Sequence, residues 1–152
     1  MFARLLLVLA MLVCAAGTAG AFEVLSPEEA LARQQAGALV IVDVRTPPEW
    51  KQTGLPAGAV GLALQAPDLK PRPGFPADME VLLGAKDRPV ALICRTGGRS
   101  SFAARWLESL GFSRVYNIAE GVAGGPNGPG WLRRGLPTTP CGDCRAPGWP
   151  GF

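Results

Sequence analysis

Residues 89–93 form a short apolar run that leads directly into a loop, Cys94 to Arg99, of sequence Cys-Arg-Thr-Gly-Gly-Arg. The segment after this loop carries apolar side chains at the spacing of one helix face: Ala103, Trp106, Leu107 and Leu110. A buried strand followed at once by a helix is typical of a parallel sheet, whose strands need crossover connections. The sequence therefore predicts a strand-to-helix junction at Cys94.

Strand and helix patterns alternate on both sides of this junction. An apolar, β-branched run at residues 38–44 is typical of a buried strand, and further short strands are expected at residues 59–64 and 114–118. Helix patterns occupy residues 27–36 and 77–83, each followed by a glycine, and a shorter one occupies residues 49–52. The alternation predicts an α/β fold, a small central parallel sheet with helices on both faces.

Glycine and proline mark the remaining segments as turns and loops. Residues 54–58 are expected to form a turn, and residues 67–76 a proline-rich loop. From Ala119 onward, 15 of the 34 residues are Gly or Pro, so no long regular element is expected there.

The chain contains no histidine, which excludes a Ser-His-Asp triad, a Cys-His pair and a His-ligated metal. Any nucleophile must therefore be activated by dipoles or arginines. No metal ion or cofactor is expected. The net charge of +3 is too small to indicate a nucleic-acid partner, and none is expected, but it leaves room for a local anion site.

Cys94 is the candidate nucleophile, because it lies between the end of a predicted buried strand and the start of a helix. Gly97 and Gly98 can adopt positive φ angles that turn successive amides inward, and the helix N-terminus adds partial positive charge. These surroundings favour the thiolate and an anionic substrate. We expect five loop residues to bind that substrate: Arg95, Thr96, Gly97, Gly98 and Arg99.

Each of these assignments has a structural alternative. Cys94 could be a buried, inert cysteine. Arg95 could be a solvated surface residue, and Arg99 could point into the loop or bind neighbouring carbonyl groups. Ser100 and Ser101 are expected to cap the helix that follows the loop.

Several motifs in order resemble a single-domain rhodanese, over residues 26–137. They are Ile-Val-Asp-Val-Arg at 41–45 with Pro-Glu-Trp at 48–50, Gly54 to Val60, Ala-Leu-Ile-Cys-Arg-Thr-Gly-Gly-Arg-Ser at 91–100, Gly-Phe at 111–112, Val-Tyr-Asn-Ile at 115–118, Glu-Gly at 120–121 and Gly-Leu-Pro at 135–137. Where many members have Gly-His-Ile-Pro-Gly-Ala, residues 54–59 read Gly-Leu-Pro-Ala-Gly-Ala.

The resemblance implies a rhodanese-like α/β fold and a sulfurtransferase that forms a persulfide on Cys94. The sulfur donor would be a small anion such as thiosulfate, and the acceptor cyanide, a thiol or a protein cysteine. Asp43 and Arg45 would help to frame the site, although a structural ion pair is the alternative, which we favour for Asp43. A non-catalytic rhodanese-like binding or sensing module is the alternative function.

The length of the loop separates sulfur transfer from phosphate chemistry. A phosphatase or arsenate reductase of related fold has five residues between its cysteine and arginine, whereas four separate Cys94 from Arg99. Ser100 stands where a phosphatase needs its arginine, and a hydroxyl cannot bind an oxyanion bidentately. The loop therefore favours sulfur as the transferred element.

Residues 1–21 have the order of a secretory signal peptide: Arg4 in a short n-region, an apolar run over 5–16, and small residues up to Ala21. Cleavage after Ala21 predicts a periplasmic or secreted protein. The alternative is an uncleaved anchor, the only membrane contact expected, but a span of roughly 20 apolar residues would have to include Gly17 to Ala21. A rhodanese-like domain over 22–137 and a Gly/Pro/Cys-rich tail over 138–152 would follow.

Cys141 and Cys144 lie two residues apart in this tail. In an oxidising compartment the favoured interpretation is a local disulfide between them. The alternatives are a thiol pair that accepts sulfur from Cys94, and half of a zinc site that would need two more ligands.

Overall fold

The computed structural model describes residues 22–142. The predicted signal peptide at residues 1–21 and Cys144 lie outside this range. Among the helices of residues 22–142, none has both the length and the apolar character that crossing a membrane requires.

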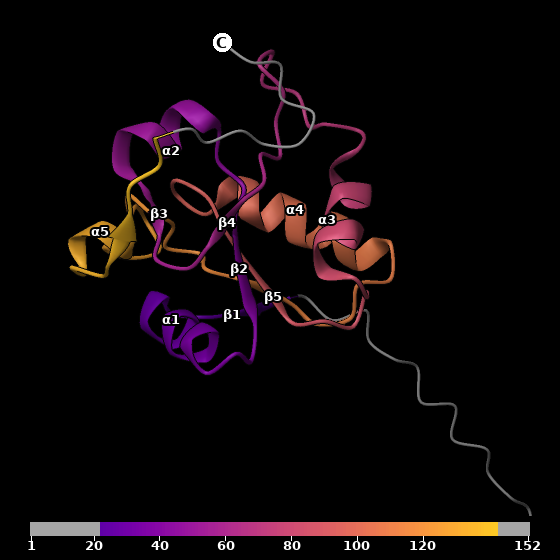
Figure 1. The fold of residues 1–152 in the computed structure, drawn as a ribbon, viewed down its shortest axis with the longest axis horizontal. Coiled ribbons are helices and arrows are strands. Elements are labelled where there is room, and N and C mark those ends of the chain that lie inside the picture. Colours follow the sequence, from indigo (N-terminus) through magenta and orange to yellow (C-terminus); the bar gives the residue numbers. More distant parts are fainter. Residues whose placement is uncertain (1–21, 143–152) are drawn as a thin grey trace, which may run out of the picture.

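A parallel sheet forms the centre of the fold (Figure 1). Its five strands are β1 (Glu23–Val24), β2 (Val40–Asp43), β4 (Val60–Gly61), β5 (Val90–Ile93) and β6 (Val115–Asn117). They are arranged in the order β1-β6-β5-β2-β4, and every pair is parallel. The predicted α/β fold with a small central parallel sheet is confirmed.

The helices are α1 (Pro27–Gln35), α2 (Pro47–Thr53), α3 (Phe75–Leu83), α4 (Gly98–Ser109) and α5 (Gly130–Arg133). The sequence signals for helix ends operate as expected at two of them. The Ser26 hydroxyl accepts a hydrogen bond from the Glu29 N–H at the start of α1, and Gly84 ends α3 in the left-handed conformation.

Two apolar layers cover the two faces of the sheet, because successive residues of a buried strand point to opposite sides. Val42 and Leu92 pack in one layer with residues of α3 and α4, whereas Ile41 and Ile93 pack in the other with residues of α1 and α5. Figure 1 shows these two pairs of helices on opposite sides of the sheet. These four side chains are fully buried. The predicted helices on both faces are therefore confirmed.

The expected turn at residues 54–58 contains a short strand that the sequence analysis missed. This strand, β3 (Leu55–Pro56), pairs antiparallel with β7 (Thr138–Thr139). At Gly54 a Cβ atom would lie 2.8 Å from the Thr139 carbonyl oxygen, so the two segments approach closely. The first residues assigned to the tail are thus paired with the domain. The strands β1, β3 and β7 have two residues each, too few to show periodicity, and were not predicted, whereas the equally short β4 lies within the strand predicted at residues 59–64.

Candidate active site

The candidate site lies at the carboxyl ends of β2 and β5, in the middle of the sheet. From β2 the chain continues to β4 on one side, and from β5 it continues to β6 on the other. Such a reversal of strand order opens a crevice outside the carboxyl ends of the two strands, which is where parallel α/β sheets bind ligands. Cys94 directly follows β5, and Arg45 lies two residues after β2.

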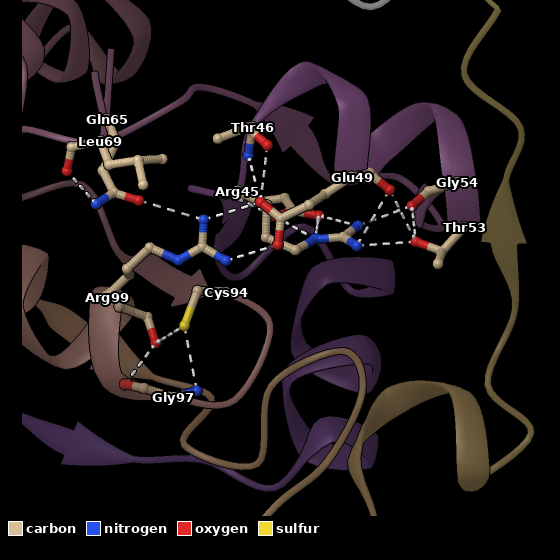
Figure 2. Close-up of polar contacts among 12 residues, drawn as sticks. Arg45, Thr46, Glu49, Thr53, Gly54, Gln65, Leu69, Cys94, Gly97 and Arg99 are labelled. Carbon is tan, nitrogen blue, oxygen red and sulfur yellow. Dashed lines mark hydrogen bonds and ion pairs between the residues drawn. The ribbon is translucent and has the colours of Figure 1, made fainter. Parts of the chain in front are cut away.

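The sulfur of Cys94 lies inside the loop that joins β5 to α4 (Figure 2). The side chain is only 1% exposed, and it is a free cysteine. Two donors hydrogen-bond the sulfur: the Gly97 N–H at 3.1 Å and the Ser100 hydroxyl at 3.4 Å. Two donors thus contact a sulfur atom that is shielded from water, while Cys94 otherwise packs in the apolar core.

The two glycines of the loop have different roles. Gly97 has a φ of 97°, and a Cβ atom there would lie 2.1 Å from the Ala119 carbonyl oxygen, so only glycine fits. Gly98 lacks a positive φ, begins α4, and has no atom within 4 Å of a Cβ position. The expectation that both glycines adopt positive φ is therefore correct for Gly97 and wrong for Gly98, because Gly98 already belongs to the helix.

The first turn of α4 presents backbone N–H groups to the loop. Gly97 is the N-cap residue and offers no side chain to accept a hydrogen bond. The N–H groups of Gly98, Arg99 and Ser100 find no acceptor within residues 22–142, as expected for the uncapped first turn of a helix. Together with the helix dipole, these donors form a site suited to an anion.

Residues 121–123, which follow β6, contact the backbone of the cysteine loop. The Val122 N–H donates to the Cys94 carbonyl at 2.8 Å, and the Ala123 N–H donates to the Arg95 carbonyl at 2.9 Å. At Gly121 a Cβ atom would lie 2.4 Å from the Arg95 carbonyl oxygen. Sequence reasoning left this segment out of the site, although its Glu-Gly motif was a signal.

The guanidinium of Arg99 forms a two-point ion pair with Glu49, a residue of the first turn of α2 (Figure 2). Nη1 lies 2.8 Å from Oε2 and Nη2 lies 2.7 Å from Oε1. The side chains are 24% and 23% exposed. Sequence reasoning did not assign Glu49 to the site, because the two partners lie 50 residues apart.

The charge of Glu49 is stabilised from two sides. Burial alone would raise its pKa, but hydrogen bonds from Arg99 and from the N–H and hydroxyl of Thr46 outweigh burial and lower the pKa to about 2. Arg99 is therefore engaged by a permanent carboxylate, and its predicted contact with the substrate anion stays a prediction.

Arg95 and Thr96 are exposed at the mouth of the loop. Within the described part of the chain, the Arg95 guanidinium has no hydrogen-bond or ion-pair partner. Its charge is therefore available to an incoming anion.

Asp43 and Arg45 form a buried ion pair. Nη2 of Arg45 lies 2.7 Å from Oδ2 of Asp43, and their side chains are 2% and 0% exposed. The same guanidinium donates to the Thr53 hydroxyl and to the Gly54 carbonyl, both at 2.8 Å (Figure 2). The pair thus connects the end of β2 to both the last residue of α2 and its C-cap, as the structural alternative expects.

The two serines after the loop do not cap α4, so that expectation is wrong. Ser100 is the third residue of the helix and turns inward, where its hydroxyl contacts the Cys94 sulfur and the Gly97 carbonyl. Ser101 accepts a hydrogen bond from the Asn117 side chain at 2.8 Å. Because α4 begins at Gly98, both serines already lie inside the helix. Their hydroxyls therefore contact the loop and the Asn117 side chain and not the N–H groups at the start of the helix.

Within residues 22–142 no group of three or more Cys, Asp or Glu residues is placed to hold a metal ion. Two surface cavities, of about 690 and 420 Å³, lie away from Cys94, which lines neither of them. Cys141 is disulfide-bonded. Because Cys144 lies outside the described residues, a bond between these two cysteines stays a prediction.

Comparison with known proteins decides the family. The family model described as a rhodanese-like domain matches residues 26–125. The chain belongs to the rhodanese-like domain family. The match includes the Cys94 loop, the Asp43–Arg45 pair and α2, and it falls within the domain expected over residues 22–137.

Two curated relatives of this rhodanese-like protein carry sulfurtransferase names. A sulfurtransferase of Allochromatium vinosum is 35% identical over 99 residues, which cover 65% of this chain and 77% of the relative. The thiosulfate sulfurtransferase GlpE of Pseudomonas entomophila is 35% identical over 100 residues, covering 66% of this chain and 81% of the relative.

A solved structure has the same fold as this rhodanese-like domain. The crystal structure of Rv0390 from M. tuberculosis superposes with a TM-score of 0.66 at 26% sequence identity. The superposition covers 80% of this chain and 99% of the solved one.

Proposed function

We propose that this protein is a sulfurtransferase that carries sulfur as a persulfide on Cys94. One observation carries the proposal: a buried free thiol beside the uncapped first turn of a helix, with donors at its sulfur. The names of the relatives from Allochromatium vinosum and Pseudomonas entomophila support the same activity.

In the loading step, the Cys94 thiolate attacks the outer sulfur of thiosulfate. The S–S bond of thiosulfate breaks, its electron pair leaves with sulfite, and a new S–S bond joins the sulfur to Cys94. Charge is conserved, since one thiolate and a dianion become a persulfide anion and a dianion. The unpaired first-turn amides of α4 are placed to bind the negative charge of donor and persulfide.

In the discharge step, a nucleophile such as cyanide or a thiolate attacks the outer sulfur of the persulfide. The bond between the two sulfur atoms breaks, and its electron pair returns to Cys94 as a thiolate. With cyanide the product is thiocyanate. The cycle needs no external oxidant or reductant.

The charged side chains around the loop would divide the remaining work. The Arg95 guanidinium, exposed and without a hydrogen-bond or ion-pair partner among the described residues, would attract the anionic donor at the mouth of the loop. Arg99 would hold the loop against α2 through its two-point ion pair with Glu49. Asp43 and Arg45 would hold α2 in the position that this ion pair requires.

The loop also supports sulfur transfer over phosphate transfer. A phosphatase loop needs a guanidinium six residues after its cysteine, to bind the equatorial oxygens of the phosphoryl group. Ser100 occupies that position and is fully buried against the sulfur. Arg99 lies one residue earlier and pairs with a carboxylate.

We further propose that the protein is exported and processed after Ala21. The order of residues in segment 1–21 supports this proposal. The disulfide at Cys141 also supports it, because structural disulfides persist mainly in oxidising compartments. Expression of the full chain in a bacterium, cell fractionation and N-terminal sequencing test it. A mature chain that begins at Phe22 in the periplasm is expected, and an unprocessed cytoplasmic chain would contradict the proposal.

Intact mass spectrometry, followed by peptide mapping to locate the added sulfur, tests the sulfurtransferase proposal. After incubation of the mature protein with thiosulfate, we expect a mass increase of one sulfur atom on the Cys94 peptide, which cyanide removes as thiocyanate. The C94S variant should take up no sulfur, whereas the S101A variant should behave as the wild type. Absence of the adduct in folded, reduced protein would favour a non-catalytic binding or sensing module.

A further inference from the structure

Ser100 has a single hydroxyl hydrogen and two acceptors within reach. The Gly97 carbonyl oxygen lies 3.1 Å away and the Cys94 sulfur lies 3.4 Å away. The side chain is fully buried, so water cannot substitute for either partner. Which acceptor receives the hydrogen depends on the charge of the sulfur, because an anionic acceptor forms the stronger hydrogen bond.

The Gly97 carbonyl can lose this hydrogen bond at little cost. It already accepts a backbone hydrogen bond from the Ser101 N–H at 3.0 Å. Rotation of the Ser100 hydroxyl toward the sulfur therefore leaves no buried carbonyl without a donor. When the sulfur is neutral, rotation back to Gly97 keeps the hydroxyl itself satisfied.

We infer that the Ser100 hydroxyl transfers its hydrogen bond between Gly97 and Cys94 during the reaction, and stabilises the Cys94 thiolate as the leaving group of the discharge step. This inference rests on the proposed function. The inner sulfur of the persulfide is bonded to two atoms and carries no charge, so the hydroxyl then donates to Gly97. As the acceptor attacks the outer sulfur, the S–S bond breaks, charge develops on the inner sulfur, and the hydroxyl turns to it.

The two half-reactions respond differently to the loss of this hydrogen bond. Discharge slows at every pH, because a less stabilised thiolate is a poorer leaving group. The rate of loading falls only at a pH where Cys94 is not fully ionised. At high pH, where the thiolate is complete without the hydrogen bond, the rate of loading returns to that of the wild type. A merely structural role for Ser100 would not separate the two steps in this way.

Stopped-flow kinetics of preloaded protein with cyanide test the discharge step. For S100A we expect a rate about tenfold below the wild type between pH 6 and 9, the size of one charge-assisted hydrogen bond. The S101A variant is the matched control, since Ser101 is the neighbouring serine and its hydroxyl binds Asn117 instead of the sulfur. Discharge of S100A at the wild-type rate would overturn the inference.

Alkylation provides a second measurement that does not depend on sulfur transfer. The rate at which iodoacetamide modifies Cys94 rises with pH, and its midpoint should move upward by about one pH unit in S100A. An unchanged midpoint would overturn the inference that the Ser100 hydroxyl stabilises the thiolate. If the wild type forms no persulfide, the proposed function fails, and the leaving-group role with it, while the alkylation midpoint still decides whether Ser100 stabilises the thiolate.

A pair of larger variants controls for effects on folding. S100T and S100V add the same bulk at this buried position and differ only in the hydroxyl group. If the hydroxyl acts on the sulfur, S100T should discharge sulfur faster than S100V and alkylate with the lower midpoint. Equal behaviour of the two would overturn the inference even if S100A failed to fold.

Discussion

Glu49 and Arg99 join α2 to the cysteine loop by two parallel N–H···O hydrogen bonds of 2.8 and 2.7 Å. The carboxylate comes from the helix after β2, and the guanidinium from the helix after β5. Both strands end at the same edge of the parallel sheet, which is why residues so distant in sequence meet there. The loop around Cys94 is thereby fixed to a second element of the fold.

Replacement of Glu49 by glutamine should reveal the Glu49–Arg99 ion pair in the pH dependence of the free energy of unfolding. The pKa of Glu49 is about 2 in the folded protein, below the usual 4.5. A carboxylate of this kind stabilises the fold fully above the unfolded pKa, and loses that contribution as the pH falls through the folded value. Urea denaturation should show E49Q less stable than wild type by about 2–3 kcal/mol at pH 7, with the difference shrinking between pH 4.5 and 2.

The control for this prediction is E80Q. Glu80 is an exposed residue whose carboxylate lies 3.8 Å from the Lys86 ammonium group. Its substitution should change the free energy of unfolding by less than about 1 kcal/mol. A difference between E49Q and wild type that stays constant from pH 7 to pH 2 would contradict the assignment of the low pKa to the ion pair.

Gly97 and Gly98 provide a matched test of the loop geometry. G97A should lower the free energy of unfolding by about 2–4 kcal/mol, because a Cβ atom would collide with the Ala119 carbonyl at a backbone conformation that alanine rarely adopts. G98A should be neutral or stabilising by up to about 1 kcal/mol, since it lies in the first turn of α4 with open space around it. If the two substitutions had similar effects in thermal or urea unfolding, the difference in backbone conformation between Gly97 and Gly98 would be contradicted.

The buried ion pair of Asp43 and Arg45 should contribute to stability through its geometry as well as its charge. Lysine keeps the charge but lacks the planar fork that reaches Asp43, Thr53 and Gly54 together. R45K should therefore lose about 2–4 kcal/mol of unfolding free energy in urea. The exposed Arg133 offers the control: R133K should lose less than about 0.5 kcal/mol, and equal losses would refute the prediction.

Arg95 should affect loading with sulfur but not folding. Its side chain is exposed and its guanidinium forms no hydrogen bond or ion pair with the described residues, so R95A should unfold within about 0.5 kcal/mol of wild type. Loading from dianionic thiosulfate should slow several-fold and lose part of its dependence on salt concentration, as expected when one steering charge is removed. A loading rate and salt dependence equal to those of wild type would remove Arg95 from the site.

The main elements of the fold could be predicted because their signals are local. Apart from Asp43, residues 38–44 and 89–93 are apolar on both faces, as a strand buried in a parallel sheet requires, and β2 and β5 lie within them. Ser26 and Gly84 marked helix ends because their effects on the backbone act within one helical turn. The position of Cys94 at a strand-to-helix junction followed from the same signals.

Other features depend on contacts between distant segments and have no local signal. Pairing of β3 with β7 joins residues more than 80 positions apart through two residues on each side. The carboxylate that binds Arg99 could not be selected from the sequence, which contains 12 acidic residues. Ser100 was expected to cap a helix, but Gly97 and not a serine is the N-cap.

The sequence by itself determined the order of the longer strands and helices, the family and the candidate nucleophile, because periodicity, caps and motifs act over a few residues. Only the tertiary structure decided which groups surround the sulfur of Cys94. Parallel strands bring α2 and α4 to one edge of the sheet, because β2 and β5 run in the same direction and each is followed by one of these helices. That edge is where Glu49 meets Arg99, and where the Ser100 hydroxyl meets the sulfur.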